Sequence, residues 1–104
     1  MMETLTETPL IQDSARAERI ADVLKALAHP IRLRIIAILV VGDEHVNAMA
    51  ERLEVPQPII SQQLRILRMR GLVEVAREKG LAVYRLAEPR LAQIIQCMEQ
   101  CHRF

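Results

Sequence analysis

Residues 49–67, MAERLEVPQPIISQQLRIL, carry the clearest indication of the fold. A short helix is expected over 47–53, at the start of this stretch. Pro56 and Pro58 then enclose a tight connection, because each proline pushes the residue before it out of helical geometry. A longer helix is expected over 58–70. A short helix, a tight turn and an amphipathic helix together indicate a helix-turn-helix.

Downstream of this stretch the apolar pattern changes from helical to alternating. Two alternating runs rich in β-branched residues lie within 72–86 and are joined by a turn at 78–80, which predicts a β-hairpin. Pro89 is suited to open a last helix, expected over 89–102. A hairpin directly after the second helix of a helix-turn-helix is the wing of a winged helix-turn-helix.

Upstream, two further helices are expected. Apolar residues three and four apart predict a helix over 14–28, and Pro30 is suited to begin a helix over 30–41 that is apolar on nearly all sides. Residues 1–12 have no periodicity and are expected to form a flexible N-terminal arm. The fold class is therefore mainly α with a β-hairpin, and residues 13–104 are expected to form one winged helix DNA-binding and dimerisation domain.

Positive charge gathers in one segment of a nearly neutral chain. The formal net charge is +1, but residues 61–90 carry seven Lys and Arg against three Glu. Residues 1–60 carry six basic and nine acidic residues. A basic segment can present a phosphate-binding face on a protein that is not basic overall. Charge counts alone leave an ordinary solvated surface as the alternative.

Neither a targeting segment nor a membrane span is evident in the sequence. The first ten residues are acidic and lack an apolar core, and the longest apolar run, Ile35–Val41, is too short to cross a bilayer. Two cysteines do not form a disulfide scaffold. We therefore expect a reduced, cytoplasmic protein without membrane contact.

The helix over 58–70 has one apolar and one polar face. Ile60, Leu64 and Leu67 share the apolar face, which is expected to pack in the core. The hydroxyl, amide and guanidinium groups on the rest of this helix can bind base edges and phosphates. Basic residues at the hairpin tip can bind the DNA backbone. The residues predicted to contact DNA are Gln57, Ser61, Gln62, Gln63, Arg65, Arg68, Arg77 and Lys79. Each feature alone is also explained by a solvated surface, whereas their combination favours DNA binding.

Three stretches resemble the ArsR/SmtB family of repressors. They are LKALAHPIRLRIIAIL at 24–39, the helix-turn-helix of 49–67 continued by GLV at 71–73, and the wing at 81–86. The resemblance covers about residues 19–86 and, more loosely, the last helix.

At the matching positions, Gln57, Ser61 and Gln62 correspond to residues that contact DNA in relatives. The sequence departs from the family at Glu54, where Gly or Asn adopts the turn more easily, and at Gln62 and Gln63, where many relatives have His.

The resemblance implies a homodimer that occupies a DNA operator and leaves it when a signal arrives. The first and last helices are expected to form the interface, which would also cover apolar surface that so small a domain cannot bury alone. The residues predicted at this interface are Ile20, Leu24, Leu91, Ile94, Ile95 and Met98. Neither the residues nor the resemblance specifies an inducer.

The metal-ligand sets of most relatives do not occur in this sequence. Residues 46–49 read VNAM where a cysteine pair would stand, and His29 is expected to be a structural residue at a helix junction. No metal or other cofactor is therefore expected. Cys97 and Cys101, four residues apart, are predicted to lie on one side of the last helix. They would sense a soft metal, a metalloid or an oxidant, or they are simply packing residues.

Together these features predict a DNA-binding transcriptional regulator, a repressor that releases its operator on a chemical signal. An enzyme is not expected, since no metal set, Ser/His/Asp arrangement or glycine-rich phosphate loop occurs. The alternative is a winged-helix protein-interaction module without DNA binding, which should expose apolar residues where this chain has Ser61, Gln62 and Arg65.

Overall fold

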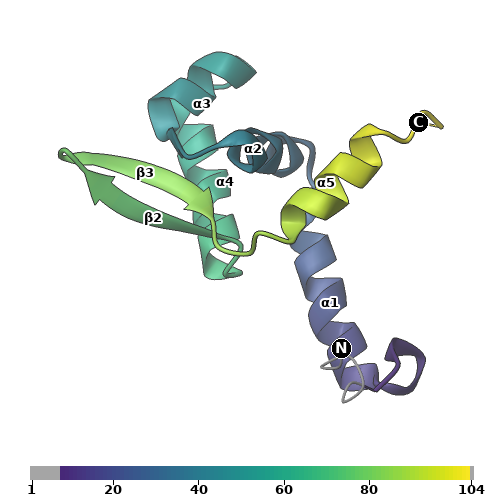
Figure 1. Cartoon of the computed structure of the whole chain (residues 1–104). Helices are drawn as coiled ribbons and strands as arrows, with labels where there is room; N and C mark the ends of the chain where they lie inside the picture. The colour runs from purple at the N-terminus through teal and green to yellow at the C-terminus, as the bar shows by residue number, and fades with distance from the viewer. Residues whose placement is uncertain (1–7, 104) are drawn as a thin grey trace.

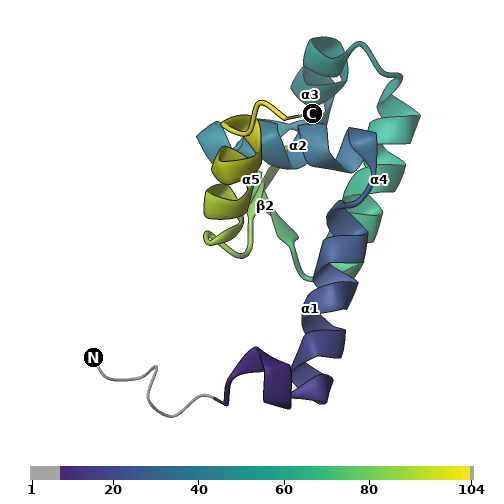
Figure 2. The ribbon, with the colours of Figure 1, turned by 90° about the vertical axis from the view of Figure 1, so that its right-hand side faces the viewer.

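The computed structural model describes residues 8–103. The chain forms a winged helix-turn-helix in which α1 projects from the body and the hairpin projects from another side (Figure 1, Figure 2). The elements are η2 (Leu10–Gln12), α1 (Ser14–Leu27), α2 (Pro30–Val41), β1 (Glu44–His45), α3 (Val46–Leu53), α4 (Gln57–Met69), β2 (Val73–Glu78), β3 (Leu81–Leu86) and α5 (Leu91–Glu99).

The first two helices begin at side-chain caps. Asp13 accepts a hydrogen bond from the backbone N–H of Arg16 at 3.0 Å, which caps α1. Nδ1 of His29 accepts from the N–H of Ile31 at 3.1 Å and caps α2, so His29 is a helix-junction residue as the sequence predicts. Helix α2 ends at Val41 with Gly42 as its C-cap, and its predicted bounds are confirmed.

The expected N-terminal arm is described only in part. Residues 1–7 lie outside the described residues, whereas Leu10–Gln12 form a single 3-10 turn before α1. The guanidinium of Arg16 donates to the carbonyl of Thr8 at 2.8 Å, which connects the segment before this turn to the helix.

Helix α2 lies at the centre of the core and packs against α1, α3, α4, α5 and β3. Its nearly uniform apolar composition follows from this position, because neighbours cover it on most sides. The side chains with the least exposure come from α2, α3 and α4, and they are Ile35, Ile36, Met49, Ile60, Leu64 and Leu67. Helix α3, whose Met49 is fully buried in the core, packs against α2 and α4 and is thereby fixed on the body.

The sheet has three antiparallel strands in the order β1-β3-β2, one more than the hairpin predicted from sequence. The hairpin turn places Lys79 at φ 53° and Gly80 at φ 81°, the two positive values that a type I′ turn requires. Strand β1 contributes only Glu44 and His45, which pair with Tyr84 and Val83. Two residues are too few to give an alternating pattern, so this strand could not be predicted.

The largest difference from the predicted elements concerns the last helix. The expected helix over 89–102 is wrong at both ends, since α5 spans Leu91–Glu99. Pro89 lies in a turn before α5, in which the N–H of Leu91 donates to the carbonyl of Glu88 at 3.1 Å. Cys101 consequently lies beyond the helix.

Candidate nucleic-acid interface

The connection between α3 and α4 sets the orientation of the helix-turn-helix. Glu54 ends α3 in the left-handed conformation, with φ 56° and ψ 44°, as expected from its position in the turn. This conformation costs a non-glycine residue about 1–2 kcal/mol. The N–H of Val55 donates back to the carbonyl of Ala50 at 3.1 Å, and Pro56 then leads into α4. The strain is held by the packing of both helices on α2.

The polar face of α4 is exposed, as the helical spacing predicts. Ile60, Leu64 and Leu67 are fully buried and hold the helix on the body. The rest of the helix surface exposes hydrogen-bonding and cationic side chains, namely Gln57, Ser61, Gln62, Arg65 and Arg68, together with the apolar Ile59 and Met69. Amides and guanidiniums on one helix face match the donor and acceptor pattern of the DNA major groove.

Gln63 was predicted to contact DNA, but in the structure its side chain is buried. Its side chain is only 8% exposed, and its Oε1 accepts a hydrogen bond from Nη1 of Arg32 at 2.8 Å. The amide therefore points into the protomer and is not available to a base edge. The sequence spacing indicates this burial, because Gln63 lies three residues after Ile60 and four before Leu67, on the core side of α4.

The wing presents the second set of cations. Arg77 and Lys79 are exposed at the end of the hairpin. Arg77 Nη1 donates to the carbonyl of Gly80 at 3.3 Å, which holds this side chain across the turn. Leu81, beside the turn, is also largely exposed. The hairpin thus carries two positive charges away from the core, on a turn whose backbone is defined by hydrogen bonding.

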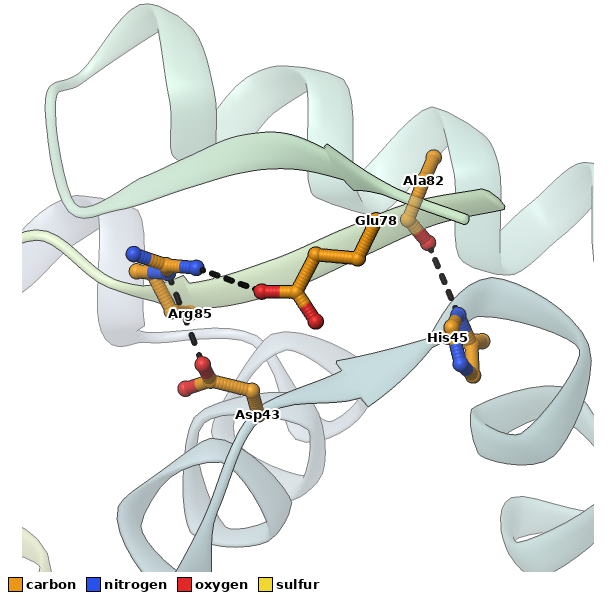
Figure 3. Close-up of polar contacts among 5 residues, drawn as sticks. All are labelled: Asp43, His45, Glu78, Ala82 and Arg85. Carbon is orange, nitrogen blue, oxygen red and sulfur yellow. Dashed lines mark hydrogen bonds and ion pairs between the residues drawn. The ribbon is translucent and has the colours of Figure 1, made fainter. Parts of the chain in front are cut away.

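Arg85 and His45 connect the strands of the wing to the segment between α2 and α3 (Figure 3). The Arg85 guanidinium lies 3.5 Å from the carboxylate of Asp43 and 3.2 Å from that of Glu78. Nδ1 of His45 forms a hydrogen bond with the carbonyl of Ala82 at 3.1 Å, which requires the proton on Nδ1. The contacts of Asp43 and His45 with the wing were not predicted, because they accompany the pairing of the unpredicted strand β1 with β3. Pairing with Arg85 also offsets the negative charge of Glu78 next to the wing tip.

Four of the six predicted interface residues are available to a partner, and two are not. Ile20 and Leu24 on α1, and Ile94 (40% exposed) and Met98 (49%) on α5, form exposed apolar surface. Leu91 (2%) and Ile95 (5%) are instead part of the protomer's own core, so predicting them at the interface is wrong for these side chains. An apolar helix face does not reveal which of its residues face the core and which face a second chain.

Cys97 and Cys101 were predicted to lie on one side of the last helix, but only Cys97 belongs to α5. Cys97 is exposed on α5, whereas Cys101 is partly buried and follows the helix end. The N–H of Cys101 donates to the carbonyl of Met98 at 3.1 Å. Both thiols are free. Within residues 8–103, no three His, Cys, Asp or Glu side chains cluster as metal ligands would.

Comparison with known proteins supports the winged helix-turn-helix fold. Residues 29–75 match the model of "Bacterial regulatory protein, arsR family". The chain is 40% identical over 92 residues to a biofilm growth-associated repressor of Agrobacterium fabrum, covering 88% of this chain and 79% of the relative.

Solved structures of similar proteins have the same architecture. The transcriptional repressor BigR from Xylella fastidiosa superimposes with a TM-score of 0.80 at 34% identity, covering 92% of this chain and all of BigR. A homodimeric winged helix-turn-helix DNA-binding domain, Mb0332 from Mycobacterium bovis, gives 0.74 at 30% identity, covering 90% of this chain and 86% of that one. None of the helices in the described part of the chain has the length and apolar character to cross a membrane. The chain belongs to the arsR family of bacterial regulatory proteins.

Proposed function

We propose that this chain is a homodimeric transcriptional repressor that reads a two-fold repeated DNA site through α4 and the wing. The observation that carries the proposal is the exposed polar face of α4, held outward by the buried Ile60, Leu64 and Leu67 and followed directly by a basic hairpin. The similarity to proteins named as repressors, and to a domain named as homodimeric and DNA-binding, supports it.

In this proposal α4 enters the major groove and the wing follows the backbone. Gln57, Ser61 and Gln62 lie in the first half of α4, the part of a recognition helix that approaches base edges. Arg65, Arg68, Arg77 and Lys79 supply the charge that binds phosphates, whatever the base sequence. This division of roles separates affinity from specificity, since phosphate contacts position the protein and base contacts select the site.

Dimerisation would place two recognition helices on one face of the DNA. The exposed apolar residues of α1 and α5, Ile20, Leu24, Ile94 and Met98, are the surface that a second copy would cover. Their burial removes apolar area from water, which favours association. A symmetric dimer then requires an operator with two inverted half-sites about one helical turn, or a small multiple, apart.

Release of the operator would follow a chemical signal, and the free thiols Cys97 and Cys101 are the groups we propose for it. Cys97 is exposed on α5, next to the residues proposed for the interface. An oxidant or a thiophilic metal reacting there would change how two protomers pack. The function proposed requires no catalysis, and it would be performed in the cytoplasm, where bacterial DNA is located.

Selection from a random pool of DNA duplexes tests the proposed function. The purified full chain should enrich an inverted repeat, and one dimer should bind each selected duplex. Gln62→Ala should weaken binding to the selected duplex more than to unselected DNA, because Gln62 would read bases. If no sequence is enriched and binding is equally weak for all duplexes, the chain is not a sequence-specific DNA reader and a protein-interaction role becomes the better account.

A further inference from the structure

A single guanidinium joins three helices inside the protomer. Arg32, on α2, donates from Nε to the carbonyl oxygen of Ala26 at 2.6 Å and from Nη1 to Oε1 of Gln63 at 2.8 Å. Ala26 lies in the last turn of α1, where a carbonyl has no partner within its own helix. Gln63 belongs to α4 and is buried. Helices α1 and α4 are therefore connected through one side chain of α2.

The two hydrogen bonds of Arg32 are suited to fixing the angle between α1 and α4. The guanidinium is planar and presents its N–H groups in a rigid fork, so the two acceptors must keep their direction as well as their distance. Hydrogen bonds with a charged donor are roughly twice as strong as neutral ones. Breaking one bond would also leave the Gln63 carbonyl unsatisfied inside the protomer, which adds to the cost of any other arrangement.

We propose that Arg32 and Gln63 are positioning residues for operator recognition, which fix the orientation of α4 relative to α1. This inference rests on the proposed function. Helix α1 carries Ile20 and Leu24, part of the proposed dimer surface, and α4 carries the proposed base-reading residues. The angle between these helices sets the separation of the two recognition helices in a dimer, and hence the half-site spacing that the dimer accepts. Arg32 and Gln63 act in this way without contacting DNA.

Operator spacing provides a readout that a purely structural role would not change. The full chain first selects an inverted repeat from random duplexes, and probes are then made with base pairs inserted or deleted between the half-sites. The measured quantity is the ratio of affinities for the selected spacing and for each altered spacing. Loss of general stability lowers the affinity for every probe alike and leaves this ratio unchanged.

Gln63→Leu removes the acceptor, and Arg32→Lys keeps the charge but loses the planar fork. Each should lower the spacing preference about tenfold, the size expected for one hydrogen bond to a charged group. Gln63→Glu retains an acceptor for Arg32 and should keep the preference, even if its added charge weakens binding to all DNA. The matched control is Arg34→Gln, two residues along the same helix and exposed, which should also keep it.

Sedimentation establishes that each variant is still a dimer before its DNA binding is compared. If Gln63→Leu and Arg32→Lys keep the native spacing preference, the inference is wrong and the two residues only stabilise the fold. If Gln63→Leu does not fold, Arg32→Lys alone decides the question in the same way. A native protein that prefers no sequence would remove the proposed function together with this inference, whereas unchanged variants of a selective native protein would remove only the inference.

Discussion

Replacing Lys79 at the tip of the wing should reduce the salt dependence of DNA binding by a predictable amount. Four exposed cations of each protomer, Arg65, Arg68, Arg77 and Lys79, are proposed to contact phosphates, which gives eight in a dimer. Each neutralised phosphate contributes about −0.9 to the slope of log K against log salt, so the native slope should be about −7.2. Removing one cation from each protomer should change it to about −5.4.

The substitution Lys79→Asn removes the charge without disturbing the turn. Lys79 has φ 53° and precedes Gly80 at φ 81°, and Asn-Gly is the pair most favoured in such a type I′ turn. The wing should therefore stay folded, and any loss of binding reports the charge. Because phosphate contacts carry no sequence information, affinity should fall by a similar factor for the selected operator and for random duplexes.

Fluorescence anisotropy with a labelled duplex, repeated between about 50 and 200 mM salt, measures the slope. Arg103→Ala is the charge-matched control, since Arg103 is exposed and follows α5, the helix that lies on the opposite side of the body from the hairpin in Figure 1. Its slope should equal that of the native protein. An unchanged slope in Lys79→Asn would show that the wing does not contact phosphates, and a native slope near zero would contradict DNA binding by this face altogether.

Three further predictions address base reading, assembly and the thiols. Gln62→Ala should cost about 1–3 kcal/mol on the selected operator and less on random DNA, whereas equal losses in competition titrations would exclude Gln62 as a base reader. Ile94→Glu should produce a folded monomer by sedimentation, because a charge would stand in the proposed interface. Its neighbour Ile95 is buried in the protomer, so Ile95→Ala should instead lower the free energy of unfolding by about 2–5 kcal/mol. If Ile94→Glu remained a dimer and Ile95→Ala became a folded monomer, the assignment of Ile94 to the interface and Ile95 to the core would be wrong. Peroxide or cadmium should weaken operator binding by the native protein but not by a Cys97→Ser, Cys101→Ser double variant; identical responses would make both cysteines packing residues.

The helices bounded by distinctive residues were predictable from the sequence. Pro30 and Gly42 delimit α2, and Asp13 caps α1, because backbone geometry at these positions depends on local residue type. Strand β1 was not predictable, since a strand of two residues forms only when β3 is already in place beside it. The early end of α5, which leaves Cys101 outside the helix, likewise has no proline or glycine to signal it.

Only the part of the candidate site that follows from residue spacing along α4 could be predicted. Spacing identifies Ile60, Leu64 and Leu67 as the buried side of α4, and exposure of Ser61 and Gln62 follows from it. The role of Gln63 depends on Arg32, which lies 31 residues earlier in the chain and meets it only in the folded protomer. Long-range polar contacts of this kind leave no periodic pattern in a sequence.

Helix α4 and the wing are proposed to form the DNA-binding face of a symmetric dimer. The most direct test is a titration of the isotopically labelled chain with a selected operator duplex, followed through backbone amide chemical shifts. We expect one set of signals for two equivalent protomers, with the largest changes in residues 57–68 and 76–81. Changes concentrated in α1 and α5, with those two segments unaffected, would contradict this proposal.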